Sequence, residues 1–511
     1  MTKQAAFPLL EALQNHINTP NCPFHTPGHK QGRGLWGPWR EFLRGYVDQI
    51  DLTELPGLDD LHNPGGAIKK AQELAADCFG ADASYFLVNG ATAGVHAMLL
   101  AFSKPGDAVL IPRNCHQAVF GGMVLSGARP VYFRPKVHPD LLIPLAADIS
   151  EVEDKLSEAD VSSLFWIHPT YHGITSDLKR VIDFVAAAKE NQAAGGQEPE
   201  AEDRAPGWRA AAYDRKIPVM VDEAHGPHFG FHCALPGSAM ELGADITVQG
   251  AHKILGAFTQ SALLHWRQGK TDRWRLEAAL RLIQSTSPSY ILMASLDAAR
   301  GQMAEQGTGL LARTLEVAEW ARAEINAIPG LHCPGKELTL QPEINGFDPT
   351  KLIVSGLDLG LTGYELGKML ARRGVLVEMA EWGAVLCLLT IADDDTTVLP
   401  LIEALRAVSN TADRRPRPEL PALPGMDIIP AMVMTPREAY FASSMPVRME
   451  AAHGHVAAEM IAPYPPGIPV LYPGERIHQD VISLIHGLRE NGATFHGPAD
   501  PNLDTIRVVG G

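Results

Sequence analysis

The sequence predicts an α/β protein with a mostly parallel large-domain sheet, followed by a smaller α/β domain and a C-terminal domain. Three observations lead to this fold class. Short apolar runs alternate with helix-length segments from about residue 65 onward, a pattern typical of parallel strands covered by helices on both faces. The alternation resumes on a smaller scale near residue 330. A Pro-rich stretch then precedes a last segment with several short strands.

The 511 residues are more than one core usually serves, so several domains are expected. We assign an N-terminal arm to residues 1–60, a large domain to 61–330, a small α/β domain to 331–410, a linker to 411–425 and a C-terminal domain to 426–511. The arm is rich in Pro, Gly and His, which excludes long helices apart from a short one at 7–17.

Seven apolar runs are the expected strands of the large domain. They lie at 84–88, 108–112, 130–133, 163–167, 218–222, 245–249 and 261–265. In parallel sheets, ligands bind beyond the carboxyl ends of the strands, so the residues after each run are functional candidates. The stretch 191–209 is rich in Gly, Pro, Ala and acidic residues and is interpreted as an exposed loop.

The small domain repeats the alternation on a smaller scale. Strands are expected at 351–356 and 385–391, and helices at 364–374 and 397–408. The C-terminal domain is expected to contain several short strands.

Composition excludes several classes of protein. The chain has 43 basic and 59 acidic residues, a net charge of −16, which argues against nucleic-acid binding. It has no unbroken apolar run of about 18 residues and no secretory signal, so no membrane association is expected. The six cysteines are scattered without a CxxC pair, which favours a reduced, cytoplasmic protein without a metal site.

The segment after the first apolar run, Asn-Gly-Ala-Thr-Ala-Gly at 89–94, opens a predicted helix. Small residues let the backbone approach an anion, and a helix N-terminus offers free N–H groups. Thr92 adds a hydroxyl. The segment is therefore a candidate phosphate site, although a plain strand-to-helix turn with Thr92 as its cap would have the same residues.

Polar side chains follow three further runs. His116 comes after 108–112 and either stacks on a flat ring or is purely structural. Asp222 ends an apolar run, where a buried carboxylate needs a protonated pyridine nitrogen, a metal or a capped N–H group as partner. Lys253 follows 245–249 and is either a solvated lysine or, if its strand neighbours that of Asp222, an amine whose pKa burial lowers.

Together these residues supply a phosphate cradle, a ring-stacking imidazole, a carboxylate for a pyridine nitrogen and an amine for an aldehyde. They occur in chain order at the ends of successive strands. This combination describes one cofactor, pyridoxal 5′-phosphate (PLP), whose ring accepts electrons when a bond at Cα breaks.

The chain resembles a known family, the Orn/Lys/Arg decarboxylases, in the short form that includes bacterial arginine decarboxylases. The matching segments are PFHTPGHKQG (23–32), DLTELPGLDDLHNPGGAI (51–68), NGATAGVHAML (89–99), PRNCHQAV (112–119), HPTYHGI (168–174), VDEAHGPHFGF (221–231), HKILGAFTQSALLH (252–265), TSPSY (286–290), PREAYF (436–441) and PYPPGIPVLYPGE (463–475). The resemblance implies the aspartate-aminotransferase-like fold (fold type I), PLP as cofactor, and a homodimer or higher homo-oligomer with shared active sites.

The resemblance also implies a role for each matching residue. Lys253 bonds the cofactor, Asp222 pairs with its pyridine nitrogen, and His116 and Ala224 pack on opposite faces of its ring. His225 lies near the ring substituents, and His225 and Lys253 are both candidates for the donor that protonates Cα.

The implied phosphate contacts are Ala91, Thr92, His252 and, toward the neighbouring subunit, Ser287. The chain departs from the family at Gly250 and Ala251, where many members carry hydroxyl residues. At least one phosphate contact is therefore lost or comes from elsewhere.

The expected reaction is decarboxylation of a basic amino acid. We favour arginine, giving agmatine for polyamine synthesis, over lysine or ornithine. An aminotransferase and a catalytically inactive regulatory homologue are the alternatives. The distal cation of the substrate requires an acidic partner, for which the candidates are Glu475, Asp59 and Asp60. The other interpretation is a surface turn for Glu475 and a cap for Asp59.

Overall fold

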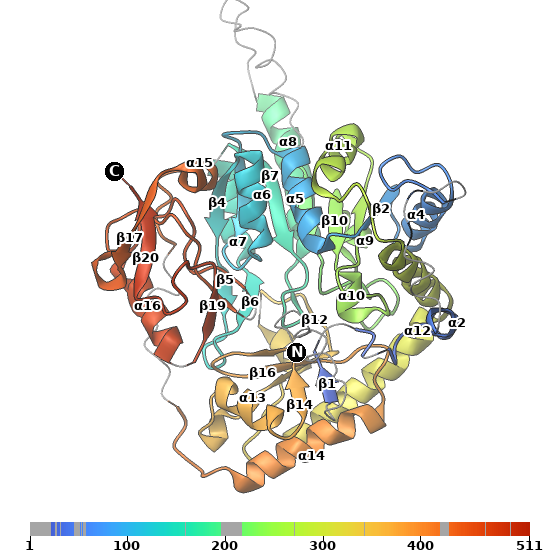
Figure 1. The fold of residues 1–511 in the computed structure, drawn as a ribbon, viewed down its shortest axis with the longest axis vertical. Coiled ribbons are helices and arrows are strands. Elements are labelled where there is room, and N and C mark those ends of the chain that lie inside the picture. The colour runs from blue at the N-terminus through green and yellow to red at the C-terminus, as the bar shows by residue number, and fades with distance from the viewer. Residues whose placement is uncertain are drawn as a thin grey trace, which may run out of the picture.

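The computed structural model describes residues 22–25, 28–30, 32–44, 52, 54, 58–158, 160–195, 217–269, 271–341, 343–418, 429–464, 467–490 and 492–510. A large sheet with its helices, a small sheet and a group of C-terminal elements lie around a common centre (Figure 1). The helix predicted at 7–17 and much of the arm lie outside the described residues.

All seven strands predicted for the large domain are present, and they form one sheet. Its order is β2 (Ala83–Leu87), β11 (Ala262–Trp266), β10 (Ile246–Gln249), β9 (Val219–Asp222), β7 (Val161–Ile167), β3 (Ala108–Pro112) and β4 (Arg129–Phe133). Only β11 runs antiparallel to its neighbours in this sheet. The predicted mostly parallel sheet is confirmed.

Both faces of this sheet are buried, which is why its strands are continuous apolar runs. Met220 of β9 packs into a cluster with helices on one face, whereas Val219 and Val221 pack into a cluster on the other. The first cluster includes α5 (Gly90–Phe102), α6 (Ala118–Ser126) and α11 (Arg273–Ile283); the second includes α7 (Ile149–Glu158), α8 (Leu178–Gly195) and α9 (Ala239–Leu242).

Helix α8 corrects one expectation. It continues to Gly195, five residues into the loop predicted at 191–209. Residues 196–216 lie outside the described part of the chain.

The small domain contains the predicted strands and helices. Strands β13 (Lys351–Val354), β16 (Val385–Leu388) and β15 (Met379–Ala380) form an antiparallel sheet with helices α13 (Gly363–Ala371) and α14 (Asp395–Thr411). The arm is attached to this domain, because β1 (Cys22–Phe24) pairs in parallel with β14 (Val375–Val377).

Helix α12 (Tyr290–Asn326) serves two cores. Its residues Leu296 and Leu311 pack into a large-domain cluster, whereas Ala318 and Ile325 pack into the small-domain cluster. The helix therefore passes from the large-domain core to the small-domain core between Leu311 and Ala318, before the domain boundary that we assigned at residue 330. The five-part division of the chain stays a prediction.

The C-terminal elements lie beside the edge of the large sheet formed by β4 (Figure 1). They are α15 (Pro436–Phe441), β17 (Ser444–Arg448), β18 (Ala462–Tyr464), α16 (Gln479–Glu490), β19 (Thr494–His496) and β20 (Thr505–Val509). The short strands pair as β17 with β20 and β18 with β19. Helix α16 was not predicted, although Val481, Ile482 and Ile485 have the helical spacing of a buried face.

Apart from the 12-residue helix α4, the remaining elements are short. They are α2 (Gly37–Leu43), α4 (Ala67–Cys78), β5 (Pro135–Val137), β6 (Pro144–Ala147), β8 (Ile174–Thr175), α10 (Ala251–Ile254), β12 (Gly346–Phe347) and the 3-10 helices Lys336–Leu340, Leu357–Leu359 and Met449–Ala451. Helix α10 carries Lys253 and therefore matters most for the site.

Candidate active site

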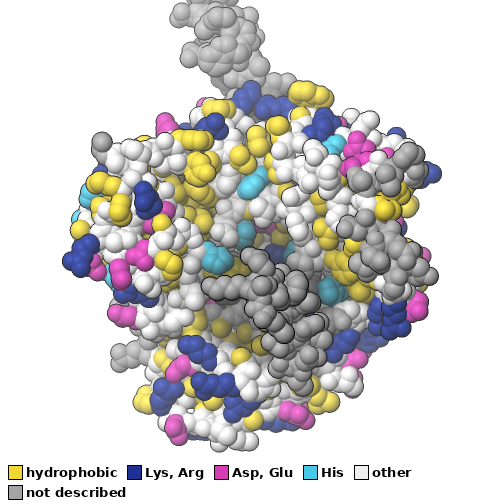
Figure 2. Space-filling view, viewed as in Figure 1, with side chains coloured by type: hydrophobic (Ala, Val, Ile, Leu, Met, Phe, Trp, Pro, Cys, Tyr) yellow, Lys and Arg dark blue, Asp and Glu magenta, His cyan; other side chains and the backbone are white. Residues whose placement is uncertain are grey.

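A cavity of about 290 Å³ lies at the carboxyl ends of the central strands. Its lining comes from the large domain, from Glu378 of the small domain, and from Tyr464 and Ile468 of the C-terminal elements. On the face drawn in Figure 2, histidine side chains gather near the middle, between these parts of the chain. The position agrees with the rule that ligands bind beyond the strand ends of such sheets.

The N-terminus of α5 forms one end of the cavity. Its N-cap residue, Asn89, makes no side-chain capping bond to the helix, and its Oδ1 accepts instead from the Ser285 N–H. The first N–H groups of α5 therefore remain for a ligand. Ala91 and Thr92 line the cavity here, as does the His252 ring, whose Nδ1 lies 3.0 Å from the Ser261 carbonyl oxygen.

Lys253 and Asp222 come together because β9 and β10 are parallel neighbours. Asp222 pairs with Val248, and Lys253 follows five residues later on α10. Burial raises the pKa of Asp222 and lowers the pKa of Lys253, and each charge partly offsets the effect of burial on the other. The condition that we set for a reactive Lys253, neighbouring strands, is thus met.

His225 is the direct partner of Lys253. Its Nε2 lies 2.8 Å from Lys253 Nζ, and its Nδ1 is buried without a hydrogen-bond partner. Burial, with the nearby charge of Lys253, lowers the pKa of His225 well below its usual value. His225 is therefore a neutral imidazole next to the reactive amine.

Two residues can enclose a flat ring between Asp222 and the α5 N-terminus. His116 lines the cavity, and its Nδ1 accepts from the Ala118 N–H at 3.1 Å. Burial lowers the pKa of His116 to about 4, so its ring is neutral. Ala224 also lines the cavity, and its N–H donates to Asp222 Oδ1 at 3.0 Å.

The packing around position 250 explains why a glycine stands there, which the sequence did not reveal. A β-carbon at this position would lie 2.9 Å from the Ala224 carbonyl oxygen and 3.2 Å from Lys253 Cδ. A larger residue would therefore push on both Ala224 and Lys253.

The sequence analysis missed Tyr171, which lies inside the quoted HPTYHGI segment. Its ring centre is 4.2 Å from that of His225, and Lys253 Nζ lies 5.1 Å from it. An alternating polar and aromatic segment directly after β7 was the available signal. Tyr171 lines the cavity and limits the space around the amine.

These residues fit PLP. The uncapped helix N-terminus suits its phosphate, the partly buried Asp222 lacks a full counter-charge that a protonated pyridine nitrogen would supply, and Lys253 can bond its aldehyde. The buried Nδ1 of His225 has no hydrogen-bond partner in the chain, so it can bind a polar group of the cofactor or substrate. Among the described residues, no cluster of His, Cys, Asp or Glu side chains could hold a metal ion, and no helix could cross a membrane.

The structure gives Glu475 a role different from the predicted one. Its side chain is 0% exposed, and its oxygens accept from the Arg113 guanidinium at 2.8 and 3.0 Å. Arg113 Cζ also lies 4.8 and 4.6 Å from the ring centres of Tyr132 and Tyr472, which stack on each other. Glu475 does not line the cavity and both of its carboxylate oxygens are engaged, so the structure gives no support to the prediction that it binds the substrate. The charge at the end of its motif therefore has a packing reason.

The other predicted acidic residues also lie outside this cavity. Asp59 accepts from the backbone N–H groups of Asp60, Gly65, Gly66 and Lys69, and Asp60 accepts from the His62 N–H. Asp59 is thus the cap that we gave as its alternative interpretation. Ser287 is exposed on the loop after α11 and does not line the cavity of its own chain; its predicted role toward a neighbouring subunit stays a prediction.

Glu378 is the acidic residue that the sequence analysis missed. Besides Asp222, it is the only acidic side chain among the described residues that line the cavity. Its charge acts on Lys253 and on the Tyr171 hydroxyl. Nothing in the sequence distinguished it, because it lies in no quoted segment and the chain has 59 acidic residues.

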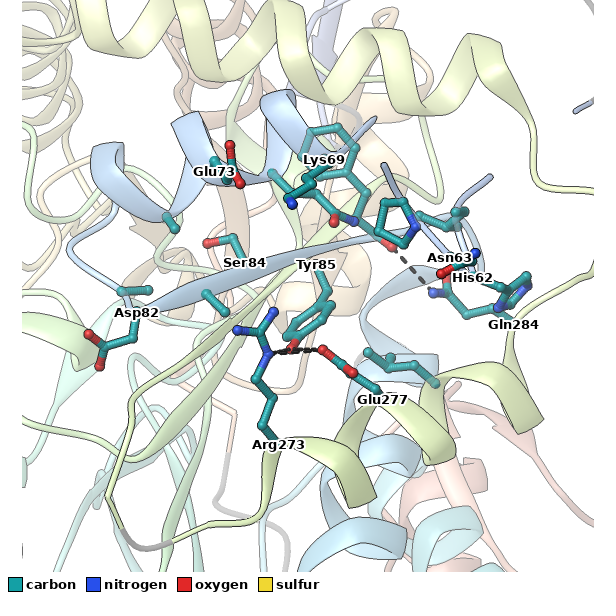
Figure 3. Close-up of a pocket in the computed structure, with 18 of the residues that line it drawn as sticks. His62, Asn63, Lys69, Glu73, Asp82, Ser84, Tyr85, Arg273, Glu277 and Gln284 are labelled. Carbon is teal, nitrogen blue, oxygen red and sulfur yellow. Dashed lines mark hydrogen bonds and ion pairs between the residues drawn. The ribbon is translucent and has the colours of Figure 1, made fainter. Parts of the chain in front are cut away.

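A larger cavity of about 740 Å³ lies along the outer edge of β2, between α4 and α11 (Figure 3). Its centre holds a network in which the Tyr85 hydroxyl donates to Glu277, and Arg273 Nε donates to both. None of the predicted site residues lines it. We therefore place the active site in the smaller cavity.

Comparisons with known proteins identify the family of the chain. The family model "Orn/Lys/Arg decarboxylase, major domain" matches residues 7–191 and 210–397, and the model of the family's C-terminal domain matches 425–500. An arginine decarboxylase of Bacillus anthracis is 38% identical, over 98% of this chain and 97% of the relative. One of Bacillus subtilis is 36% identical, over 98% and 97%.

Solved structures confirm the fold. The lysine decarboxylase of Francisella novicida superposes with a TM-score of 0.73 at 21% identity, over 98% of this chain and 81% of that one. An alanine–glyoxylate aminotransferase from Nostoc gives 0.53 at 16% identity, over 76% and 96%. The predicted aminotransferase-like architecture is thereby confirmed, and the chain belongs to the Orn/Lys/Arg decarboxylase family of PLP-dependent carboxy-lyases.

Proposed function

We propose that this enzyme decarboxylates L-arginine to agmatine, for polyamine synthesis, with PLP bonded to Lys253. The family acts on basic amino acids. The observation that carries the choice of arginine is that a carboxylate, Glu378, and an aromatic ring, Tyr464, line the same cavity. The similarity to proteins named arginine decarboxylase supports it. Lysine and ornithine are the alternative substrates.

The bound cofactor supplies an electron sink for the bond between Cα and the carboxylate. The residues of the chain prepare it for this task. Asp222 would keep the pyridine nitrogen protonated, because a buried carboxylate favours a nearby positive charge. His116 and Ala224 would confine the ring from opposite faces, and the N-terminus of α5 with Thr92 and His252 would hold the phosphate.

Lys253 and His225 can exchange a proton with each other and donate it to the substrate. Their nitrogen atoms Nζ and Nε2 lie 2.8 Å apart, within hydrogen-bond distance. Burial keeps the imidazole neutral and favours the neutral amine. A proton held between Nζ and Nε2 can therefore be delivered to Cα after CO₂ has left, by either nitrogen.

Glu378 and Tyr464 suit a guanidinium better than an ammonium. A guanidinium is planar, binds a carboxylate through two parallel hydrogen bonds and stacks on aromatic rings. The orientation of the Tyr464 ring is fixed by stacking on His496, with ring centres 3.8 Å apart and ring planes at 14° to each other. An ammonium would use only the charge of Glu378, so arginine gains more from this pair.

The test is a side-by-side measurement of CO₂ release from arginine, lysine, ornithine and the neutral analogue norleucine. We expect the highest kcat/KM for arginine and almost none for norleucine. Formation of a keto acid from arginine instead of CO₂ would favour an aminotransferase. Failure of the purified protein to take up PLP would favour the inactive regulatory homologue.

We also propose a cytoplasmic homodimer, or a higher homo-oligomer, with shared active sites. Trp274 and Leu282 of α11 are 68% and 78% exposed, and a partner subunit on this helix would remove both side chains from water. The loop that carries Ser287 follows this helix and contacts Asn89 at the start of α5. All six cysteines are free, which suits a reducing compartment.

A further inference from the structure

The arm segment at residues 28–30, which we call the arm wedge, lies against the helix that carries Lys253. The Gly28 N–H donates to the His252 carbonyl oxygen at 2.6 Å. A β-carbon on Gly28 would lie 2.5 Å from the carbonyl carbon of Ile254 and 2.6 Å from its oxygen. The arm backbone thus contacts the residues on both sides of Lys253, so closely that only glycine fits at position 28.

The other side of the arm wedge is fixed to the small domain. The Gly28 carbonyl oxygen accepts from the Thr390 hydroxyl at 2.9 Å. Thr390 is itself held by Asp393, whose carboxylate accepts from both its N–H and its hydroxyl. The wedge therefore fills the junction between α10 and the end of β16.

Lys30 anchors the wedge. Its side chain is 0% exposed, and its ammonium donates to the carbonyl oxygens of Leu388 at 2.8 Å and His25 at 3.1 Å. Burial lowers its pKa, and the charges of Asp393 and Glu378 oppose that effect. Burying an ammonium is costly, and an apolar side chain of similar length would fill the same space without that cost. The donated hydrogen bonds are what a lysine adds.

The backbone of Lys30 gives a second, independent sign of a constrained position. Its φ is +45°, in the left-handed region that residues with a β-carbon rarely adopt. Such a conformation persists only where the surroundings enforce it, as they do at functional sites.

We propose that Lys30 is a positioning residue for Lys253. Its hydrogen bond to the Leu388 carbonyl oxygen holds the arm in place. Gly28 is thereby kept in contact with the backbone at His252 and Ile254, and this contact fixes the direction of the Lys253 side chain into the cavity. It acts without touching the ligand, because no residue before Gly90 lines the cavity among those that the structure describes. The proposal rests on the assignment of Lys253 as the residue that bonds the cofactor.

The test compares two ligands on the apoenzyme of the wild type and of Lys30→Met. PLP can bond to Lys253, whereas pyridoxine 5′-phosphate has an alcohol in place of the aldehyde and can only bind noncovalently. We expect Lys30→Met to slow bond formation with PLP, followed by stopped-flow absorbance, by roughly tenfold to a hundredfold, as for a reactive group misplaced by about 1 Å. The Kd of pyridoxine 5′-phosphate should stay within about twofold of the wild-type value, because its contacts do not include Lys253.

An unchanged rate with PLP, or equal weakening of both ligands, would overturn the positioning role. The matched control is Arg322→Met, which removes bonds from a side chain to the carbonyl oxygens of Pro334, Pro349 and Lys351 within the small domain. It should lower stability without slowing the PLP reaction.

A second variant keeps the test decisive if Lys30→Met does not fold. Thr390→Val removes the hydroxyl that donates to Gly28 but retains the shape of the side chain, and the same two ligands and the same outcomes apply. If the wild type itself bound PLP no more tightly than pyridoxine 5′-phosphate, Lys253 would not be the bonding residue. That result would refute both assignments and is seen without any variant.

Discussion

Lys253 and Asp222 depend on each other for their charge. Both are partly buried, and burial favours the neutral form of each, so that the pKa of the amine falls and that of the carboxyl rises. The charge of either group opposes this trend in the other. A bound pyridine nitrogen would give Asp222 a second cation and would leave Lys253 free to react as a neutral amine.

Replacing Lys253 by alanine should abolish the visible absorbance of the bound cofactor and nearly all turnover. No other amine in the described cavity lining can take its place. Absorbance spectra and CO₂ release measure the two effects. The control is Lys179→Ala, which removes an exposed lysine of α8 and should change neither. Near-normal activity of Lys253→Ala would show that the wrong lysine was assigned.

Changing Asp222 to asparagine should leave PLP bound but lower kcat by about 10² or more, the typical effect of losing a preorganised electrostatic contact. The amide has the same shape as the carboxylate but lacks the charge that keeps the pyridine nitrogen protonated. Steady-state kinetics and a PLP titration separate the two effects. Unchanged turnover would exclude this role.

For Glu378, we expect the substitution Glu378→Gln to raise KM for arginine far more than it alters the cofactor absorbance. A hydrogen bond to a charged group contributes about 1.5–3 kcal/mol, which corresponds to a loss of about tenfold to a hundredfold in kcat/KM. Kinetics with arginine and lysine measure the effect. If arginine and lysine kinetics were both unaffected, the substrate cation would bind elsewhere.

At the scale of elements, the site depends on how strand and helix ends are joined. The Arg113 and Glu475 pair connects the end of β3 to a C-terminal loop, three residues before His116. The Arg113 and Glu475 side chains are 12% and 0% exposed, so the pair is largely shielded from water. This connection fixes the segment that carries His116, the residue that we propose stacks on the cofactor ring.

Glu475→Gln should therefore reduce stability rather than substrate affinity. The change leaves a buried guanidinium without its counter-charge, which costs about 3–5 kcal/mol. Urea unfolding should show a lower midpoint, while KM for arginine stays near the wild-type value in the folded enzyme. A raised KM with unchanged stability would restore Glu475 as a substrate ligand.

At the scale of the whole molecule, the cavity needs more than one core. The large domain supplies Lys253 and Asp222, whereas Glu378 and Tyr464 come from the small domain and the C-terminal elements. Helix α12 joins the first two cores, since it packs into both. A change in the angle between these parts would separate the reactive amine from the carboxylate that we assign to the substrate cation.

Shared sites predict subunit complementation. Ser287→Ala and Lys253→Ala, each impaired alone, should regain about a quarter of wild-type activity when mixed and reassembled as dimers. Half of the random dimers are then mixed, and one of their two sites has both residues intact. CO₂ release after mixing measures this, with each variant reassembled alone as control. A monomer that is active at high dilution would exclude shared sites.

The sequence by itself determined the seven strands of the large sheet and the order of Thr92, His116, Asp222 and Lys253 at their ends. Strands buried on both faces appear as unbroken apolar runs, and the ligand side of such a sheet is fixed by strand direction. Local pattern and a physical rule were therefore enough to identify the cofactor.

Only the tertiary structure decided which strands are neighbours, and which acidic residue reaches the cavity. Glu475 ends a long motif, yet its partner Arg113 lies 362 residues away in the sequence. Glu378 lies in no motif, yet the packing of the small domain brings it to the cavity. A carboxylate has the same appearance in a sequence whether it forms a buried ion pair, caps a helix or faces a ligand. The free energy that separates these roles comes from burial and from distant partners, which exist only in the folded chain.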